Sequence, residues 1–421
     1  MEVRKGYKQT EVGVIPEDWE IKSLSSITEI SGGGTPSTTV AEYWNGQISW
    51  VSAGDVSNAN GRFVRETAYH ISELGLASSS TKIVPAGTTI IIARGATVGR
   101  MAQLGMAMAF NQTCYCLLSG SGLDQNYLYY SMMFSINSIR ALTYGTIFGT
   151  ITTNSFQEWK IPLPSLPEQH AIAAALSDVD ALLNSLDALI AKKRLIKQGA
   201  MQELLTPPSA AGQAGKKRLP GFSGEWEVKK LGDLCTAITD GTHFTPTYVN
   251  QGIPFYSVEN VTADDFTNTK FISRQAHNQL IKRCKPEKGD ILMTRIGSLG
   301  DTKLIDWDVN ASIYVSLALL KVNKQAINEK YLYSYTRSRK FIKDVELRSL
   351  IYAIPQKINM RDIGGVPILV PSLPEQTAIA EILSDMDAEI SALEQKREKT
   401  RLLKQGMMQE LLTGRIRLVQ P

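Results

Sequence analysis

Residues 164–206 read PSLPEQHAIAAALSDVDALLNSLDALIAKKRLIKQGAMQELLT, and residues 371–413 read PSLPEQTAIAEILSDMDAEISALEQKREKTRLLKQGMMQELLT. The two stretches align without a gap at an offset of 207 residues, and 27 of their 43 positions are identical. Chance does not produce a match of this length, so the chain contains an internal repeat.

Each copy of the repeat predicts one long helix. Ser165-Leu166-Pro167-Glu168 and Ser372-Leu373-Pro374-Glu375 both fit a capping box with proline in the first helical turn, where its missing N–H costs nothing. Apolar residues then recur at spacings of four and three, which is typical of a coiled-coil seam. The predicted seam consists of Leu176, Val179, Leu183, Leu186 and Ile190 in the first copy and of Leu383, Met386, Ile390 and Leu393 in the second.

Two nearly identical seams in one chain pack most simply on each other. At about 1.5 Å per residue, roughly 38 residues form a rod about 57 Å long, so we expect a two-helix rod that joins two heads. The alternative is an ordinary amphipathic helix in the core of each domain. Pro207 to Gly215 is rich in proline, alanine and glycine and predicts a flexible linker after the first helix.

The regions upstream of the two helices also correspond, more faintly. Trp19-Glu20 matches Trp226-Glu227, Arg94 matches Arg295, and the offset wanders because of insertions and deletions. Short apolar strands separated by glycine and proline turns, followed by a helical stretch, predict a mixed α/β fold for each head. The expected class is α+β, as a tandem repeat with boundaries at 1–163 (first head), 164–206 (first helix), 207–221 (linker), 222–370 (second head) and 371–415 (second helix).

The composition limits the class of protein. A chain of 421 residues with 43% hydrophobic content can build several cores, and the net charge of +4 is too small to establish nucleic-acid binding. The charge is uneven: residues 1–163 carry 11 Lys/Arg against 12 Asp/Glu, whereas residues 222–370 carry 20 against 16. No apolar run is long enough for a membrane helix and no signal peptide is recognisable, so we expect a cytoplasmic protein with free thiols.

Enzyme signatures are missing from the sequence. It contains no Walker loop, no dinucleotide-binding glycine motif, no Asn/Asp-Pro-Pro-aromatic motif of an adenine methyltransferase and no Gly-x-Ser-x-Gly. Glu20-Ile21-Lys22 and Glu227-Val228-Lys229 have the Glu-x-Lys spacing of metal-dependent nucleases, but a further carboxylate is needed to hold Mg²⁺. We therefore predict no catalytic residue, no metal site and no cofactor in this chain.

Two loops in each head are candidates for binding nucleic acid. Arg94 to Arg100 and Arg295 to Asp301 each place an arginine before a glycine loop, where backbone and hydroxyl groups approach phosphates and arginine reads guanine. A second loop precedes each long helix, at Tyr144 to Thr150 and Tyr352 to Lys357. A tight turn with a solvated arginine, or a plain connecting loop, is the alternative. The predicted contacts are Arg94, Thr97, Arg100, Tyr144, Thr146, Arg295, Ser298, Lys303, Tyr352, Gln356 and Lys357.

This organisation resembles the specificity subunits of type I restriction-modification systems. The opening Gly6 to Glu20, both Leu-Pro-Glu-Gln boxes, both Lys-Gln-Gly triplets and Gln409 to Gly414 look like that family's repeated motifs. The similarity spans essentially the whole chain. It is strong in the helices and weak in the heads, and Asp301 departs from the basic Arg100.

The resemblance implies two target-recognition domains, each reading half of a bipartite site in double-stranded DNA, and an antiparallel coiled coil that fixes the spacer. It also implies two methyltransferase subunits that bind S-adenosylmethionine, and restriction/translocase subunits that use ATP and Mg²⁺. The isolated chain is expected to self-associate through exposed seams. The rival hypotheses are a non-catalytic coiled-coil adaptor that binds proteins or glycans and, third, an enzyme.

Overall fold

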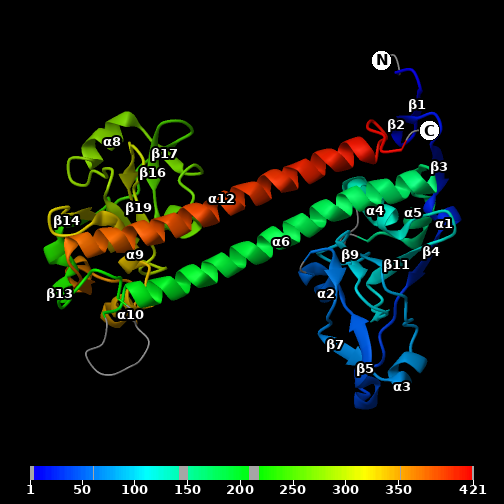
Figure 1. Ribbon diagram of the computed structural model, residues 1–421, viewed down its shortest axis with the longest axis horizontal. Helices are drawn as coiled ribbons and strands as arrows, with labels where there is room; N and C mark the ends of the chain where they lie inside the picture. The colour runs from blue at the N-terminus through cyan, green and yellow to red at the C-terminus, as the bar shows by residue number, and fades with distance from the viewer. Residues whose placement is uncertain (1–3, 60, 142–149, 208–217, 351, 420–421) are drawn as a thin grey trace. The chain divides into compact units, whose positions relative to one another are not determined.

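The computed structural model describes residues 4–59, 61–141, 150–207, 218–350 and 352–419. The chain divides into two compact units: Met1–Ala188 with Glu394–Pro421, and Leu189–Leu393. Each unit therefore holds one head, part of the long helix α6 (Leu166–Leu204) and part of the long helix α12 (Leu373–Leu411). Figure 1 shows both helices as uninterrupted ribbons, and their bounds differ by the repeat offset of 207 residues at each end.

The head of the first unit is a mixed α/β fold. Its main sheet has the strand order β4-β11-β8-β9-β6, a second sheet has the order β10-β5-β7, and two pairs are β1-β2 and β12-β3. The elements are β1 (Tyr7–Thr10), β2 (Gly13–Pro16), β3 (Glu20–Ser23), α1 (Leu24–Ile27), β4 (Thr28–Gly32), η1 (Ala41–Tyr43), β5 (Trp44–Val51), α2 (Ala53–Asn58), β6 (Phe63–Val64), β7 (Tyr69–Ile71), α3 (Glu73–Ala77), β8 (Thr89–Ile92), β9 (Met101–Leu104), β10 (Ala109–Phe110), β11 (Cys114–Ser119), α4 (Gln125–Ala141), α5 (Thr153–Glu158) and β12 (Lys160–Leu163).

The head of the second unit repeats this topology. Its sheets have the orders β14-β21-β18-β19 and β15-β17-β16-β20, with the pair β13-β22. The elements are β13 (Glu227–Lys230), η2 (Leu231–Leu234), β14 (Cys235–Asp240), β15 (Tyr248–Val249), β16 (Ile253–Tyr256), α7 (Val258–Ala263), β17 (Lys270–Ile272), α8 (Arg274–Leu280), β18 (Ile291–Thr294), β19 (Thr302–Leu304), β20 (Ser312–Ile313), β21 (Leu317–Val322), α9 (Glu329–Thr336), α10 (Arg339–Arg348), α11 (Met360–Gly364) and β22 (Pro367–Val370).

The repeat seen in the sequence is thus a repeat of folds. β4, β11, β8 and β9 correspond to β14, β21, β18 and β19, and the parallel pair β5–β10 corresponds to β16–β20. The central strands β8 and β18 are buried at every position, which suits their runs of β-branched and large apolar residues. The helical stretch expected after the strands is two helices in the second head. The first, α9, ends at Thr336 with Arg337 as its C-cap, and Ser338 caps α10 by accepting a hydrogen bond from the Phe341 amide.

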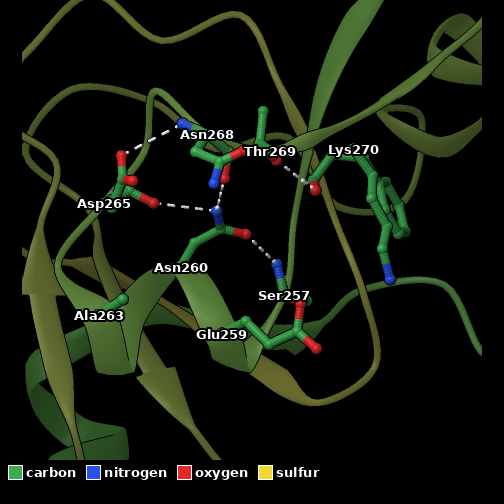
Figure 2. Close-up of a pocket in the computed structure, with 9 residues that line it drawn as sticks. Ser257, Glu259, Asn260, Ala263, Asp265, Asn268, Thr269 and Lys270 are labelled. Carbon is green, nitrogen blue, oxygen red and sulfur yellow. Dashed lines mark hydrogen bonds between the residues drawn. The ribbon is translucent and has the colours of Figure 1, made fainter. Parts of the chain in front are cut away.

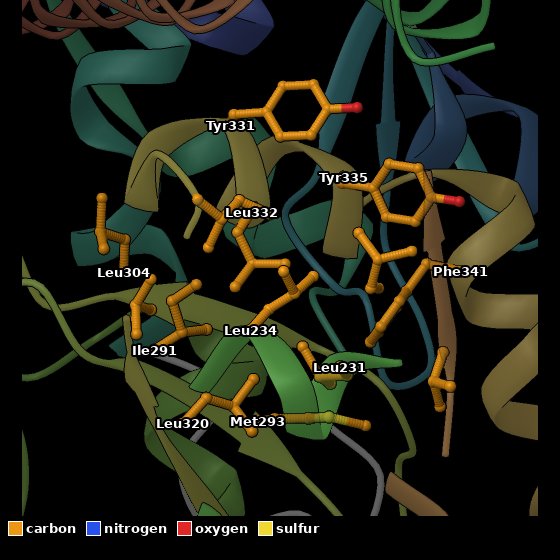
Figure 3. Close-up of a cluster of buried hydrophobic side chains, with 14 of the residues drawn as sticks. Leu231, Leu234, Ile291, Met293, Leu304, Leu320, Tyr331, Leu332, Tyr335 and Phe341 are labelled. Atoms are coloured by element: carbon orange, nitrogen blue, oxygen red, sulfur yellow. The ribbon is translucent and has the colours of Figure 1, made fainter. Parts of the chain in front are cut away.

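The core of each unit includes both long helices. In the second unit, residues of η2, β18, β21, α9 and α10 pack around Tyr331 and Tyr335 (Figure 3). Leu205, just after α6, and Ile379, Ala380 and Leu383 of α12 belong to the same cluster. In the first unit the roles of the helices are exchanged, since Ile172, Ala173 and Leu176 of α6 cluster with Met408, Leu411 and Leu412 from the end of α12. Within each unit the start of one long helix therefore packs with the end of the other, which is the antiparallel arrangement.

Candidate nucleic-acid interface

The two candidate loops of the second head lie side by side, and the described end of the second loop in the first head has an equivalent contact. In the second head, the Gly297 amide donates to the Gln356 carbonyl at 2.8 Å and the Ile358 amide donates to the Arg295 carbonyl at 3.0 Å. In the first head, the Ile151 amide donates to the Ala93 carbonyl at 2.9 Å. In the second head, the loop after β18 and the loop before α11 therefore form one continuous surface, and in the first head the described residues Thr150 and Ile151 join the residues after β8 in the same way.

The strand register corrects one expectation about these loops. Ile92 pairs with Cys114 in the first head and Thr294 pairs with Leu317 in the second, so Ala93 is the structural equivalent of Arg295. The bridges Arg94–Thr150 and Ile296–Lys357 are likewise equivalent. The expected equivalence of Arg94 and Arg295 is wrong by one residue. A shift of one position moves a side chain to the opposite face of a strand, so the two arginines point in different directions.

The first head exposes its candidate arginines. Arg94 and Arg100 are exposed and Thr97 is half-buried. The Arg100 guanidinium donates to the Ser57 carbonyl at 3.1 Å, which holds the side chain over α2. Tyr144 and Thr146, the other two candidates in this head, lie outside the described residues.

Arg295, in contrast, is buried in an ion-pair cluster around Asp240. Asp240 ends β14 and is 4% exposed, and Arg295 is 8% exposed. The Arg295 guanidinium donates to Asp240 at 3.0 Å and to the Val315 and Ile358 carbonyls at 3.1 and 3.3 Å. The same carboxylate accepts a hydrogen bond from Arg283 at 2.6 Å and contacts His243 Nε2 at 2.8 Å. In this arrangement Arg295 positions the loop, and its direct contact with DNA stays a prediction.

The other candidates of the second head are mostly exposed. Tyr352 is 98% exposed, and Lys357 and Ser298 are also exposed. Ser298 donates to Asp301, and Gln356 donates to Ser349 Oγ at 2.8 Å. The ammonium group of Lys303 forms an ion pair with Asp264 at 2.5 Å, and this carboxylate offsets its positive charge. Sequence reasoning did not identify Asp240, His243 or Arg283, because only the fold brings residues from three segments together.

The repeated Leu-Pro-Glu-Gln boxes have a structural explanation. Glu168 is 1% exposed, accepts a hydrogen bond from Trp19 Nε1 at 3.1 Å, and pairs with Arg417 at 2.5 and 2.7 Å. Glu375 pairs in the same bidentate way with Arg218, at 2.8 and 2.6 Å. The two glutamates thus bind arginines from distant segments instead of the helix backbone expected for a capping box.

The glutamine of each box joins its helix to the head. Gln169 accepts a hydrogen bond from the Asp124 amide at 2.8 Å, and Gln376 accepts one from the Asn328 amide at 2.9 Å. Each also donates to the proline carbonyl that precedes its helix, at 2.9 and 2.8 Å. Both side chains are buried, so the glutamines fix the first turn of α6 and α12 to the start of α4 and α9.

Repeated ion pairs link the two long helices within each unit. Lys404 pairs with Asp180 at 2.6 Å in the first unit, and Lys197 pairs with Asp387 in the second. The lysines and the aspartates are each 207 residues apart, so the two pairs are equivalent. Burial lowers the pKa of Lys197, opposed by its hydrogen bond to Asp387.

The predicted seam residues are all buried or half-buried. Five are buried: Leu176, Leu186, Ile190, Leu383 and Ile390. The other four are half-buried: Val179, Leu183, Met386 and Leu393. A different apolar set is exposed on the helices at positions that repeat at the 207-residue offset, namely Leu195 and Ile196 on α6 and Leu402 and Leu403 on α12.

A polar cavity of about 280 Å³ lies in the second head (Figure 2). The buried amide of Asn260 shapes it by accepting from the Ser257 amide at 2.9 Å and donating to the Asp265 and Asn268 carbonyls at 2.9 and 3.2 Å. Because these groups satisfy one another, we assign the cavity a structural role in holding the turn after α7.

The structure also bears on the possible metal ligands, the Glu-x-Lys patterns and the cysteines. In the ranges that the structure covers, no group of three or more His, Cys, Asp or Glu side chains could hold a metal ion. Lys22 pairs with Glu20 and Lys229 with Glu227, each at 2.8 Å, so the Glu-x-Lys patterns are surface ion pairs. The four cysteines are free thiols. Among the described residues, the helices are all too short or too polar to cross a membrane.

Two copies of one mixed α/β head, each fixed to repeated antiparallel helices, define a two-headed recognition protein. Residues 16–194 and 223–403 match the model of the type I restriction modification DNA specificity domain. These matches cover most of the chain, which therefore belongs to this family and carries two copies of its domain.

Known proteins agree with this assignment along the whole chain. The chain is 24% identical to the type I restriction enzyme MjaIX specificity subunit of Methanocaldococcus jannaschii, over 98% of this chain and 96% of that protein. The MjaVIII specificity subunit of the same organism is 26% identical over 96% and 94%. The crystal structure of the type I S subunit from M. genitalium has the same fold, with a TM-score of 0.62, 18% identity and 98% coverage of both chains.

Proposed function

We propose that this chain is the DNA-specificity subunit of a type I restriction-modification complex. Each head reads one half of a bipartite target in double-stranded DNA through the paired loops that follow β8 and β18. The observation that carries the proposal is the duplication itself: two heads of one topology have equivalent backbone contacts after their central strands, at Ala93 with Ile151 and at Arg295 with Ile358. Heads on one duplex meet the same groove about one turn apart, roughly 34–36 Å, so α6 and α12 set the spacer between the half-sites.

The long helices also hold the partner subunits in this proposal. Leu195 and Ile196 form one exposed apolar patch, and Leu402 and Leu403 form its repeat. Exposed apolar side chains gathered on a helix are typical of protein interfaces. Two equivalent patches suit two identical partners, which we take to be the methyltransferase subunits.

The chemistry belongs to the partners. The methyltransferase subunits bind S-adenosylmethionine, flip the target adenine out of the duplex and methylate it, one in each half-site. Restriction/translocase subunits add ATP- and Mg²⁺-dependent cleavage. In this proposal the chain determines which DNA sequence is bound and how far apart the half-sites lie, and it contributes no catalytic group.

Co-expression with the neighbouring methyltransferase gene, followed by modification-sensitive sequencing of the host DNA, tests the proposal. We expect methyladenine in a single split motif with a fixed gap, and none when the methyltransferase is expressed alone. Methylation at a continuous motif would contradict the role of the helices as a spacer. A stable complex without new methylation would favour a protein-binding adaptor instead.

A further inference from the structure

The Asp240 cluster of the second head has more positive charge than its structural role requires. Two guanidinium groups, from Arg295 and Arg283, share one carboxylate, so the cluster carries a net charge of +1 before His243 is counted. Arg295 satisfies the buried side of Asp240, since its other hydrogen bonds go to backbone carbonyls. Arg283 and His243 are different, because their side chains are 61% and 60% exposed while Asp240 holds them.

The loop that carries His243 is fixed at its base by backbone contacts. A Cβ on Gly241 would lie 2.1 Å from the Ile313 carbonyl oxygen, so the backbone packs directly against β20. The Thr242 amide donates to the same carbonyl at 3.1 Å, and the Val315 amide donates to the Thr242 carbonyl at 3.0 Å. His243 therefore projects from a loop whose base is fixed, beside the exposed Phe244.

The first head lacks this cluster. Gly32 pairs with Tyr115 on β11 as Asp240 pairs with Ala318 on β21, so glycine occupies the position of Asp240. Alanine, at position 93, occupies the position of Arg295. The carboxylate and the buried arginine are thus present together in the second head and absent together from the first. The Asp240–Arg295 ion pair is therefore specific to the second head.

We propose that Arg283 and His243, oriented by the buried Asp240, bind a backbone phosphate of the DNA half-site read by the second head. A guanidinium held by one of its nitrogens keeps its remaining N–H donors in a fixed direction, and an anionic oxygen is the ligand that such donors prefer. Asp240 is a positioning residue that acts through the other two. The inference rests on the proposed function and adds a phosphate contact that is specific to one head.

Binding of the complex of this chain with its methyltransferase subunits to a duplex carrying its mapped split motif tests the inference. Fluorescence anisotropy over a range of salt concentrations gives Kd and its salt dependence for the wild type, R283Q, H243Q and the double variant. Loss of a charge-assisted contact weakens binding about tenfold for R283Q, and the salt slope falls by about one phosphate contact. The same loss is expected on duplexes without the motif, because a phosphate contact carries no sequence information.

R361Q is the matched control, since Arg361 is an exposed arginine on α11 of the same head. Both tested side chains are exposed, and unchanged melting of the complex shows that the variants fold. An unaltered Kd and salt slope in the double variant would overturn the inference while leaving the proposed function intact. A changed half-site motif with an unchanged salt slope would also overturn it, in favour of a base contact. Failure of the wild-type complex to bind any duplex would instead contradict the proposed function.

Discussion

Arg94 and Arg295 differ in role because of a single step in strand register. Arg295 occupies the inward-facing position that Ala93 holds in the first head, where a cation needs a buried partner, and Asp240 supplies it. Arg94 occupies the outward-facing position that Ile296 holds in the second head. The burial of each side chain follows from the alternation of faces along a strand.

Removal of Arg295 is therefore expected to destabilise the second head. R295Q leaves the buried Asp240 with fewer donors, at a cost of about 2–3 kcal/mol, somewhat below the usual cost of breaking a buried pair because Arg283 and His243 remain. Hydrogen–deuterium exchange should show faster opening of β14 and β18. R94Q is the matched change in the first head and should leave exchange there within the wild-type range. Unchanged exchange in R295Q combined with lost DNA binding would mean that Arg295 leaves the cluster to contact DNA.

Acid should weaken a second residue contact, between Arg417 and Asp18. The hydrogen-bonded guanidinium of Arg417 holds the pKa of Asp18 below its ordinary value of 3.8, so the ionised form is favoured in the folded state. Stability from this contact is present above that value and is lost as the pH falls below it. The difference in free energy of unfolding between the wild type and D18N should therefore stay constant from pH 6 to about pH 5 and shrink as the pH falls further, toward 3. A constant difference over this range would show that Asp18 does not contribute.

At the scale of elements, the ends of the long helices depend on arginines that lie far away in the sequence. Arg417, after α12, reaches Glu168 at the start of α6, and Arg218, after α6, reaches Glu375 at the start of α12. R417Q leaves a buried carboxylate with only the Trp19 hydrogen bond, and we expect a loss of about 1–3 kcal/mol. Faster hydrogen exchange should appear in the first turns of α6, and R218Q should have the same effect on α12. R415Q is the control, because Arg415 pairs with Glu410 at the surface, at 3.4 Å. Equal effects of R415Q and R417Q would exclude a special role for the buried pair.

Sequence reasoning was most successful for these elements. The repeat and the apolar spacing predicted three of the four ends of the long helices to within two residues, and the end of the second helix, expected at residue 415, lies four residues earlier at Leu411. A long heptad-like pattern has few alternative structures. Features that join residues from separate segments were not predictable. They are the contact between the two candidate loops, the Asp240 cluster and the arginines that bind the glutamates at the helix starts. The 207-residue spacing of Lys197 and Lys404 was a visible signal, but their aspartate partners could be assigned only from the fold.

The exposed helix patches carry a prediction about assembly. The double change Leu402→Gln and Leu403→Gln should remove one of two methyltransferase subunits, and Leu195→Gln with Ile196→Gln should remove the other. Native mass spectrometry of the co-expressed complex counts the subunits directly. Leu74→Gln is the control, since Leu74 is an equally exposed leucine on α3 of the first head. Retention of both subunits in each double variant would show that docking uses another surface.

At the scale of the whole molecule, the duplication predicts that the heads are exchangeable readers. Each head has its own sheets, and its core continues into long-helix residues of its own unit, such as Ile379 and Leu383 in the second unit. A graft of residues 222–370 from another family member should therefore fold if it keeps the apolar residues that face these positions. In the sequencing assay, the half-site read by the second head should change, while the other half-site and the spacer length stay the same. The spacer should persist because α6 and α12 are not part of the graft. A change in both half-sites would mean that the heads do not read independently. A change in the spacer alone would mean that the heads, and not the long helices, determine the spacer length.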